Sequence, residues 1–426
     1  MLPATSKLME KHVQLQLSSH LNSNSLLFPL QSGFRPSHST QTLLLHCLDR
    51  WYKALDQKKL VGVVFLDISK AFDTVSHELL LSKLSSLGLS ASAVSWFCSY
   101  LSNRCHVTRV ADSYSSPGFP SSGVPQGSVL GPTLFSVFIN DLPSVLPPDS
   151  TVLFADDTTI YIVSDNLSSI QSSLQLCLDL ANLWLQRNGL KINVSKTKSM
   201  LIHSSRKIVD GNLTLKIEES IVEQVRCCKF LGVVVNDTLT WVDHIDMVCK
   251  KVSRSLNLLR RLSWFLPQPL LVLFLKSYIL PHFDYCDVVW FGCTKSESHR
   301  LESLLNFACR TVLRRCKHSS ASAARHDLGL STLSSRRKLH LSQTVFKCLS
   351  SHCPSYLSQL FSGPNSSHHT RSYSSCQLNL PLTRSSFGQR SFSFTGASMW
   401  RSLPANICKM NDFWAFSTKC EDFLLD

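Results

Sequence analysis

Two short apolar segments of this chain end in acidic residues, and this feature constrains the fold more than any other. The run 61–66 is rich in β-branched residues, predicts a buried strand and stops at Asp67. Residues 151–163 predict a hairpin of two strands with Asp156 and Asp157 at its tip. A carboxylate that follows a buried strand is costly unless another group compensates its charge.

Strand ends of this kind, placed side by side, would form a dense negative cluster. A hard divalent cation is the natural compensation, and Mg²⁺ prefers such oxygen ligands. Carboxylates that hold two metal ions a few ångströms apart form a site for phosphoryl transfer. Each piece alone also has an ordinary explanation. An Asp-Asp turn is usually a solvated hairpin tip, and an Asp after a strand is usually a helix N-cap.

The remaining segments alternate between helix and strand without the even spacing of a doubly wound fold. Helical patterns fall at 8–28, 40–59, 76–87, 91–101, 129–141 and 167–188, and short strands are expected at 199–203, 213–217 and 229–235. The hairpin at 151–163 favours a mixed or antiparallel sheet with helices on one face. The expected fold class is therefore α+β.

The positive charge is concentrated in one part of the chain. Lys and Arg number 43 and Asp and Glu 29 in 426 residues, a net charge of +14. Residues 250–350, which look mainly helical, carry 17 basic and 5 acidic side chains. This stretch predicts either a polyanion-binding surface or an ordinary solvated basic face. Beyond about 351 the chain is typical of a loosely ordered linker, as at 364–369, and 387–424 is expected to fold back.

The cysteines and the N-terminus bear on the compartment. The sixteen cysteines are scattered, with no CxxC pair and no zinc-ligand spacing, so we expect mostly buried, reduced thiols and no zinc. No secretion signal is visible at the N-terminus. The most apolar stretch, 262–280, is interrupted by Pro267, Pro269 and Lys276 and is a poor membrane span, so no membrane partner is expected.

A series of motif-sized blocks stands in a fixed order, and together they are far more specific than any one alone. They are Gln31-Ser-Gly-Phe-Arg-Pro-Ser-His-Ser-Thr40, Phe65-Leu-Asp-Ile-Ser-Lys-Ala-Phe-Asp-Thr-Val75, Gly123-Val-Pro-Gln-Gly-Ser-Val-Leu-Gly-Pro132, Phe154-Ala-Asp-Asp157, Trp184-Leu-Gln-Arg-Asn-Gly-Leu-Lys-Ile-Asn193 with Lys196-Thr-Lys198, and Phe230-Leu-Gly-Val233. They resemble the fingers block and motifs A to E of reverse transcriptases from non-LTR (LINE-type) retrotransposons. Residues 281–290, 387–390 and 400–404 resemble later parts of the CR1/L2-like group.

The resemblance implies a right-hand polymerase with a ferredoxin-like palm built on an antiparallel sheet. Residues 1–60 would be partial fingers and 61–245 the palm with motifs A to E. Residues 246–350 would be a basic, helical, thumb-like region, and 351–426 the Ser-, Pro- and His-rich segment with the family tail. The opening residues resemble the middle of a fingers motif, so an N-terminally truncated member is expected, without the endonuclease of such elements.

The implied function is that of an RNA-directed DNA polymerase, which adds deoxynucleotides to a primer 3′-hydroxyl by two-metal chemistry. The implied cofactor is a pair of Mg²⁺ ions, with Mn²⁺ as an alternative. The implied partners are an RNA template, a DNA primer and deoxynucleoside triphosphates. Work at chromosomal DNA implies the nucleus, for which the chain itself offers only the short basic run Arg336-Arg-Lys338.

The matching motifs assign catalytic roles residue by residue. Asp67, Asp156 and Asp157 are expected to hold the metals, with Asp156 the closer ligand of the pair and the backbone carbonyl of Ile68 an extra ligand. Lys196 matches a lysine proposed to protonate the leaving pyrophosphate, although it could equally be a solvated charge.

Four further residues are expected to bind the nucleotide. Phe72 stands where the family places its sugar gate, a bulky ring that excludes a ribose 2′-hydroxyl, or else it is a plain core aromatic. Gln126 and Gly127 are expected to line the nucleotide and template pocket, because glycine permits close backbone approach, or else they form a structural turn. Arg35 is expected to touch template or nucleotide, or else it is a surface arginine.

Leu231 and Gly232 are expected in the primer grip, although a tight turn between strands explains them as well.

Two hypotheses for the whole chain stay open. It is either a polymerase intact in its palm, or a catalytically impaired, truncated element copy that acts at most as a nucleic-acid-binding protein. An RNA-directed RNA polymerase or a maturase shares the palm, but Phe72 and the long match into the tail argue against both.

Overall fold

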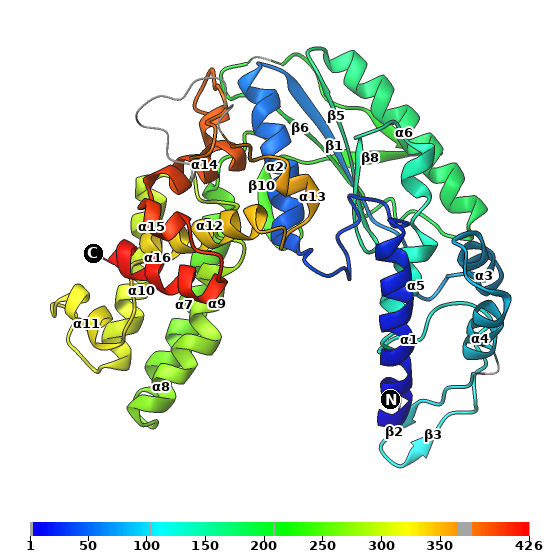
Figure 1. The fold of residues 1–426 in the computed structure, drawn as a ribbon, viewed down its shortest axis with the longest axis horizontal. Coiled ribbons are helices and arrows are strands. Elements are labelled where there is room, and N and C mark those ends of the chain that lie inside the picture. Colours follow the sequence, from blue (N-terminus) through cyan, green and yellow to red (C-terminus); the bar gives the residue numbers. More distant parts are fainter. Residues whose placement is uncertain (1–2, 103, 208, 364–376, 426) are drawn as a thin grey trace. The chain divides into compact units, whose positions relative to one another are not determined.

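The computed structural model describes residues 3–102, 104–207, 209–363 and 377–425. The described parts divide into two compact units, each assembled from separate stretches of the chain. The first unit comprises Met1–Ser39, Gly62–Leu201 and Val209–Val225, and the second comprises Thr40–Val61, Ile202–Ile208 and Arg226–Asp426 (Figure 1).

A six-stranded sheet forms the centre of the first unit. Its strand order is β4-β5-β1-β6-β8-β7. The strands are β1 (Leu60–Leu66), β4 (Thr151–Phe154), β5 (Asp157–Ser164), β6 (Lys198–Ile202), β7 (Leu215–Ile217) and β8 (Ser220–Gln224). The pairs β4/β5 and β7/β8 are antiparallel, whereas β6/β8 is parallel. The sheet is therefore mixed, which is one of the two alternatives that the hairpin at 151–163 favoured, because β7 intervenes in sequence and returns β8 to the direction of β6.

Within the described residues, the first unit also contains six helices. They are α1 (Ala4–Ser23), α3 (His77–Ser86), α4 (Ala91–Leu101), α5 (Gly131–Phe138), the 3₁₀ helix η1 (Leu142–Val145) and α6 (Leu167–Arg187), with a small hairpin of β2 (Arg109–Val110) and β3 (Ser113–Tyr114). Helix α6 packs on β5 and β7. It also lies directly over Gly62 of β1, where a Cβ atom would stand 2.2 Å from a methyl carbon of Ile170. Gly62 therefore permits the close approach of helix and strand.

The second unit is mainly helical. It contains α2 (Thr40–Asp56), the antiparallel hairpin of β9 (Cys227–Phe230) and β10 (Val233–Asn236), α7 (Val242–Leu262), α8 (Gln268–Phe274), the π-helical η2 (Leu275–Ile279), α9 (Leu280–Asp284), α10 (Lys295–Val312), α11 (Ala321–Asp327), α12 (Leu333–Leu349), α13 (Ser355–Ser358), η3 (Gly388–Arg390), α14 (Phe392–Ser402), α15 (Ala405–Cys408) and α16 (Phe413–Leu425). Helix α2 is buried along most of its length and packs on α13, η3 and α14.

The local patterns predicted most elements with their type, including the helices over 8–28, 40–59 and 167–188. The single strand expected at 229–235 is wrong. Leu231 and Gly232 have φ values of +45° and +86°, so the chain reverses there and forms the β9/β10 hairpin. The expected return of the C-terminal segment is confirmed, because Phe416 stacks on Phe346 and on Trp400 with ring centroids 4.5 and 5.5 Å apart. The segment 364–369 lies outside the described residues.

The compact units do not follow the expected subdomain ranges. Helix α2, expected among the fingers, belongs to the same unit as the chain beyond 226, and so does the β9/β10 hairpin expected in the palm. The ranges 1–60, 61–245, 246–350 and 351–426 stay predictions about polymerase subdomains.

The cysteines only partly match their expectation. The described chain contains fifteen of them, all free thiols, but only six are buried, so the prediction that most are buried is wrong. The exposed ones are Cys98 in α4, Cys227 in β9, and Cys105 and Cys316 in connecting segments. Within the described residues, no helix is both long and apolar enough to cross a membrane.

Candidate active site

The three candidate metal ligands stand at strand ends of the first unit, as the sequence predicts. Asp67 directly follows β1, Asp156 lies in the turn after β4, and Asp157 opens β5. Strands β5 and β1 are neighbours in the sheet. The three side chains are close enough for their charges to act on one another.

Burial and this mutual repulsion both act on the pKa values of the pair at the turn. Burial, and then the charge of Asp67, raises the pKa of Asp156 above its ordinary value. Burial, and then the charges of Asp156 and Asp67, raises the pKa of Asp157 to about 6. Asp157 is nonetheless exposed at the surface, so solvent and ions reach its carboxyl group. The cluster therefore carries negative charge that no neighbouring cation neutralises fully.

The donor set fits hard divalent cations, which such carboxylates bind and whose charge would relieve this repulsion. The three carboxylates are not drawn into one tight group. Within the described residues, the one group of three such side chains with ligand atoms all within 4.8 Å lies elsewhere, at Asp284, Asp287 and His340. A wider spread suits two ions, because paired metals in such sites stand about 4 Å apart.

The turn that presents Asp156 depends on a residue that the motif analysis did not assign. Ala155 adopts φ +56°, in the left-handed region that non-glycine residues rarely occupy. The buried side chain of Gln31 stabilises it, because its Oε1 accepts hydrogen bonds from the backbone N–H of Ala155 at 3.1 Å and of Gly33 at 2.8 Å. Backbone bonds between residues 30–32 and Leu153 place Gln31 beside β4.

The end of β1 is held by the segment that contains Lys196. The backbone N–H of Asp67 donates to Thr197 Oγ1 at 3.2 Å, and its carbonyl accepts from the N–H of Asn193 at 2.8 Å. Ile68 forms an isolated bridge with Ile192, and among the described residues no backbone N–H is bonded to the Ile68 carbonyl. The side chain of Lys196 is exposed. The structure thus places Lys196 in the segment that binds the Asp67 backbone, and its role as a proton donor stays a prediction.

Phe72 belongs partly to the core and partly to the surface. It is half-buried and stacks on Phe135 with ring centroids 4.4 Å apart, while the exposed Phe34 meets it edge-on at 6.4 Å. Both readings of Phe72 are therefore compatible with its position, and its role as a gate stays a prediction.

Gln126 and Gly127 lie in an exposed loop before α5. Gln126 Nε2 donates to Asp73 Oδ1 at 2.8 Å. Gln126 and Asp73 both line a cavity of about 870 Å³ in the first unit. Gly127 has φ +81° with open space where a side chain would stand, so its backbone can be approached closely.

The last two expected groups serve structural contacts. Arg35 is half-buried, and its Nη1 donates to the carbonyls of Phe28 and Gln31 at 3.0 and 3.1 Å. Leu231 and Gly232 form the β9/β10 turn in the second unit. Functional contacts of all three with nucleic acid or nucleotide stay predictions.

Tyr285, which no motif assigned, holds the β9/β10 turn. Its hydroxyl donates to the carbonyl of Leu231 at 2.9 Å, and a Cβ on Gly232 would stand 2.9 Å from the ring. The sequence separation of 54 residues explains why no local pattern indicated this contact.

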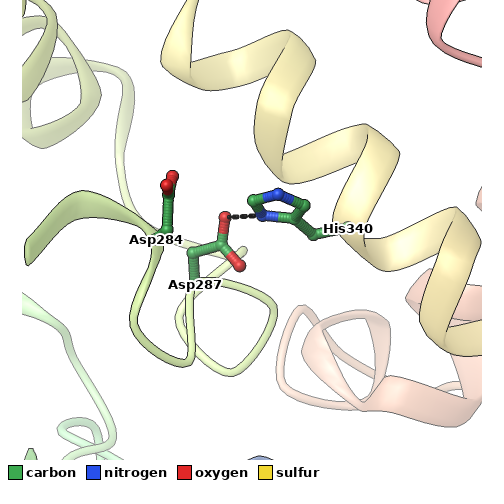
Figure 2. A group of neighbouring side chains, drawn as sticks. All are labelled: Asp284, Asp287 and His340. Atoms are coloured by element: carbon green, nitrogen blue, oxygen red, sulfur yellow. Dashed lines mark hydrogen bonds and ion pairs between the residues drawn. The ribbon is translucent and has the colours of Figure 1, made fainter. Parts of the chain in front are cut away.

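The group Asp284, Asp287 and His340 forms a charge network (Figure 2). His340 Nδ1 binds Asp287 Oδ2 at 2.6 Å, and Arg336 binds both oxygens of Asp284, at 3.1 and 2.6 Å. Burial alone would lower the pKa of His340, but the hydrogen bond to Asp287 and its charge outweigh burial, so the pKa is raised. The donors are thus engaged with one another and with Arg336.

The basic stretch 250–350 is less free than its composition suggests. Arg300, Arg315, Arg325 and Arg336 form ion pairs with carboxylates. Arg337 is buried against Trp290, so two members of the short run Arg336-Arg-Lys338 are engaged in the fold. The exposed cations concentrate on α7 at Lys250, Lys251, Arg254, Arg260 and Arg261.

Exposed aromatic residues follow α7 directly. Trp264 and Phe265 are each 83% exposed. A basic helix face beside exposed rings is typical of surfaces that bind nucleic-acid strands, through phosphates and base stacking.

Comparison with known proteins agrees with this geometry. The family model for reverse transcriptase (RNA-dependent DNA polymerase) matches residues 1–235. A probable RNA-directed DNA polymerase from transposon BS of Drosophila melanogaster is 29% identical over 356 residues, which are 80% of this chain and 39% of that protein. The RNA-directed DNA polymerase from mobile element jockey of Drosophila melanogaster is 30% identical over 275 residues, 62% of this chain and 29% of that protein. This chain therefore spans well under half the length of these relatives.

Among solved structures, apo telomerase from Candida Tropicalis is similar over 74% of this chain and 51% of that chain, at 12% identity and a TM-score of 0.44. A TM-score in this range falls short of demonstrating a shared fold. The family model covers more than half of the chain and includes all three strand-end aspartates. The resemblance to polymerases of non-LTR retrotransposons is confirmed by the relatives, and the chain belongs to the reverse transcriptase family.

Proposed function

We propose that this chain is an RNA-directed DNA polymerase of a non-LTR retrotransposon, with a right-hand arrangement of partial fingers, ferredoxin-like palm and helical thumb. The observation that carries the proposal is the cluster at the ends of β1 and β4 and the start of β5. There, burial and then the charges of Asp156 and Asp67 raise the pKa of Asp157 to about 6. Such a cluster is costly unless it binds a cation.

Reverse transcriptases use divalent metal ions, and we propose that Asp67, Asp156, Asp157 and the Ile68 carbonyl hold two Mg²⁺ ions, with Mn²⁺ as an alternative. When bound, such ions activate the attacking hydroxyl and stabilise the leaving oxygen. The chain's contribution is to place the carboxylates. Gln31 and Thr197 fix the backbone on either side of the cluster, so the carboxylates are positioned before substrate arrives.

The residues around the cluster then divide the remaining tasks. The ring of Phe72 would exclude a ribose 2′-hydroxyl, and its stacking on Phe135 keeps it in place. Gln126 and Gly127 would contact the nucleotide and template. Arg35, whose Nη1 binds the carbonyls of Phe28 and Gln31, would touch template or nucleotide. Lys196 would donate a proton to the departing pyrophosphate.

The proposed partners are an RNA template, a DNA primer and deoxynucleoside triphosphates. The primer would contact Leu231 and Gly232 at the β9/β10 turn, and the exposed basic face of α7 would hold the duplex through its phosphates. Action at chromosomal DNA would require the nucleus. The run Arg336-Arg-Lys338 gives this little support, because two of its members are engaged in the fold.

Primer extension on an RNA template with deoxynucleotides and Mg²⁺ tests the proposal. Asp156→Ala should lower the extension rate by orders of magnitude, because a lost metal ligand removes stabilisation of the transition state. The matched control is Asp165→Ala, which removes an exposed carboxylate elsewhere in the first unit and should leave the rate unchanged.

Extension that survives in Asp156→Ala would contradict the assignment of the cluster. Absence of extension in the parent chain, with salt-sensitive RNA binding retained, would instead identify an impaired element copy that binds nucleic acid without copying it.

A further inference from the structure

A cavity of about 840 Å³ in the second unit has no part in the roles described so far. Four stretches far apart in sequence line it: the end of α2 with the turn that follows, residues 204–207, Thr238 with Thr240, and the C-terminal segment 384–390. The segment 384–390 includes the block 387–390 that resembles the family tail, for which the polymerase reaction offers no task.

The lining is strongly cationic. Six basic side chains contribute to it, from three of the four stretches: Lys58, Lys59, Arg206, Lys207, Arg384 and Arg390. Among the residues that the structure describes, none of the six forms an ion pair with a carboxylate. Like charges gathered around one cavity repel each other, and an anionic ligand would relieve this repulsion.

The one carboxylate in the lining, Asp56, is already engaged. Its oxygens accept hydrogen bonds from the backbone N–H of Arg384 at 3.0 Å and of Ser385 at 2.6 Å, and from the Ser385 hydroxyl at 2.7 Å. Burial alone would raise the pKa of Asp56, but these donors and the N–H of Gly388 outweigh burial and hold the pKa below its ordinary value. Gly388 permits the contact, because a Cβ there would lie 2.7 Å from the Asp56 carboxyl carbon.

The cationic stretches are therefore held together in the folded chain. Asp56 anchors the C-terminal segment to the end of α2, and Lys207 Nζ donates to the carbonyl of Lys58 at 2.9 Å. Arg390 is positioned by its contact with the ring of Phe387, 5.7 Å from its centroid. Lys58, Arg206 and Arg384 remain exposed, so an external ligand can reach them.

We propose that this cavity binds the phosphodiester backbone of a nucleic-acid strand, as a site separate from the aspartate cluster. A small free anion would favour backbone N–H groups as donors, but Asp56 already occupies those of Arg384 and Ser385. The remaining donors are long side chains spread around the cavity, which suit successive phosphates. Such contacts position a strand without reading its sequence.

This inference rests on the proposed function only in that the ligand is a nucleic acid. Binding is therefore measured without Mg²⁺ and deoxynucleotides, so that catalysis does not contribute to the result. The full chain is titrated against a fluorescently labelled single-stranded RNA over a series of salt concentrations. The test variant Lys58→Gln/Arg206→Gln/Arg384→Gln removes three exposed charges that make no side-chain hydrogen bond among the described residues. The control variant Lys7→Gln/Lys216→Gln/Arg401→Gln removes three exposed charges outside the cavity.

If the cavity binds the backbone, the slope of log binding constant against log salt should become shallower by about 2 in the test variant, at about 0.7 per lost contact. The control should keep the parental slope, and Lys58→Arg/Arg206→Lys/Arg384→Lys should retain it. Thermal melting of each variant excludes loss of fold. If the slope of log RNA-binding constant against log salt is unchanged in the test variant, the proposal is overturned. A small-anion site would be identified instead by two results together. The parent would bind tripolyphosphate tightly and stoichiometrically, and the test variant would lose that binding while its salt slope for RNA stays parental. Since Asp156→Ala should bind RNA as the parent does, failure of catalysis and failure of this site are distinguishable.

Discussion

A side chain that no catalytic role was assigned to can still position the aspartates of the site. Gln31 stands in the first strongly matching block of the chain, yet its side chain serves the backbone of Ala155, 124 residues further on. It is fully buried, and its Oε1 is the acceptor that pairs two backbone donors at the turn. Gln31 is therefore a positioning residue for Asp156.

Replacing Gln31 tests this role. In Gln31→Ala, the N–H groups of Gly33 and Ala155 lose their acceptor, and a buried unpaired donor costs about 1–3 kcal/mol. If this cost falls on the catalytic geometry, kcat should drop about 10- to 100-fold, while RNA binding measured without Mg²⁺ stays parental. The control is Gln57→Ala at an exposed position. A parental kcat in Gln31→Ala would contradict the positioning role.

The raised pKa of Asp157 predicts a pH-dependent cost to the fold. The carboxyl group titrates near 6 in the folded chain and near 3.8 when unfolded, so the folded state holds the proton more tightly. Its contribution to stability is therefore present at low pH and is lost as the pH rises from about 4 to about 6. Above that range the ionised cluster destabilises the fold.

Asp157→Asn removes that cost. At pH 7.5 the variant should have a free energy of unfolding higher by about 1 kcal/mol, a value discounted for the solvent exposure of the group. The gain should vanish by about pH 4, and Mg²⁺ should stabilise the parent more than the variant. Denaturant unfolding across pH 4–8 measures this. A difference independent of pH would show that the repulsion is not its source.

At the scale of elements, the β9/β10 hairpin shows how one turn depends on a distant aromatic ring. Gly232 combines φ +86° with a contact to Tyr285 that leaves no room for a Cβ. Gly88, between α3 and α4, has a nearly identical φ of +83° with open space around it. A comparison of substitutions at Gly232 and Gly88 therefore distinguishes the cost of the left-handed backbone from the cost of crowding by Tyr285.

We expect Gly232→Ala to lower the free energy of unfolding by about 1–2 kcal/mol from the left-handed backbone alone, with a further loss from the displaced Tyr285. Gly88→Ala should show only the first part. If Leu231 and Gly232 grip the primer, Gly232→Ala should also raise the KM for primer, and Gly88→Ala should not. If the two substitutions change stability and the KM for primer equally, the outcome would contradict both the crowding of Gly232 by Tyr285 and the role of Gly232 in the primer grip.

At the scale of the whole molecule, the chain passes repeatedly between its two compact units. Helix α2 precedes most of the first unit in sequence but belongs to the second, where it packs on α13, η3 and α14. The family match over residues 1–235 therefore includes α2 but none of these partners. The matched region is not a self-contained unit of this structure.

This interleaving predicts the behaviour of a shortened chain. A fragment of residues 1–235 would lack α13, η3 and α14 and so expose part of the buried surface of α2, and exposed apolar area of this kind favours aggregation. It should be less soluble than the full chain, lack a cooperative thermal transition and be cleaved within α2 by limited proteolysis. A soluble fragment that melts cooperatively would show that α2 finds other partners.

The sequence by itself determined the features that depend on local pattern and short spacing. Apolar runs placed β1 and the β4/β5 hairpin, helical spacing placed α2 and α6, and the order of the motifs placed three aspartates at strand ends. These succeed because periodicity and turn residues act over a few neighbouring positions. The same local reasoning failed at 229–235, where an apolar run conceals a reversal that needs Tyr285.

Only the tertiary structure decided what joins residues far apart in the chain. It paired Gln31 with Ala155, anchored 384–388 on Asp56, and bound Arg336 to Asp284. Within the described part of the chain, it left the six cations around the second-unit cavity without carboxylate partners. A count of charges along the sequence located the excess in 250–350, but it could not tell paired cations from available ones. Pairing depends on which side chains the fold brings within a few ångströms, and no local pattern records that distance.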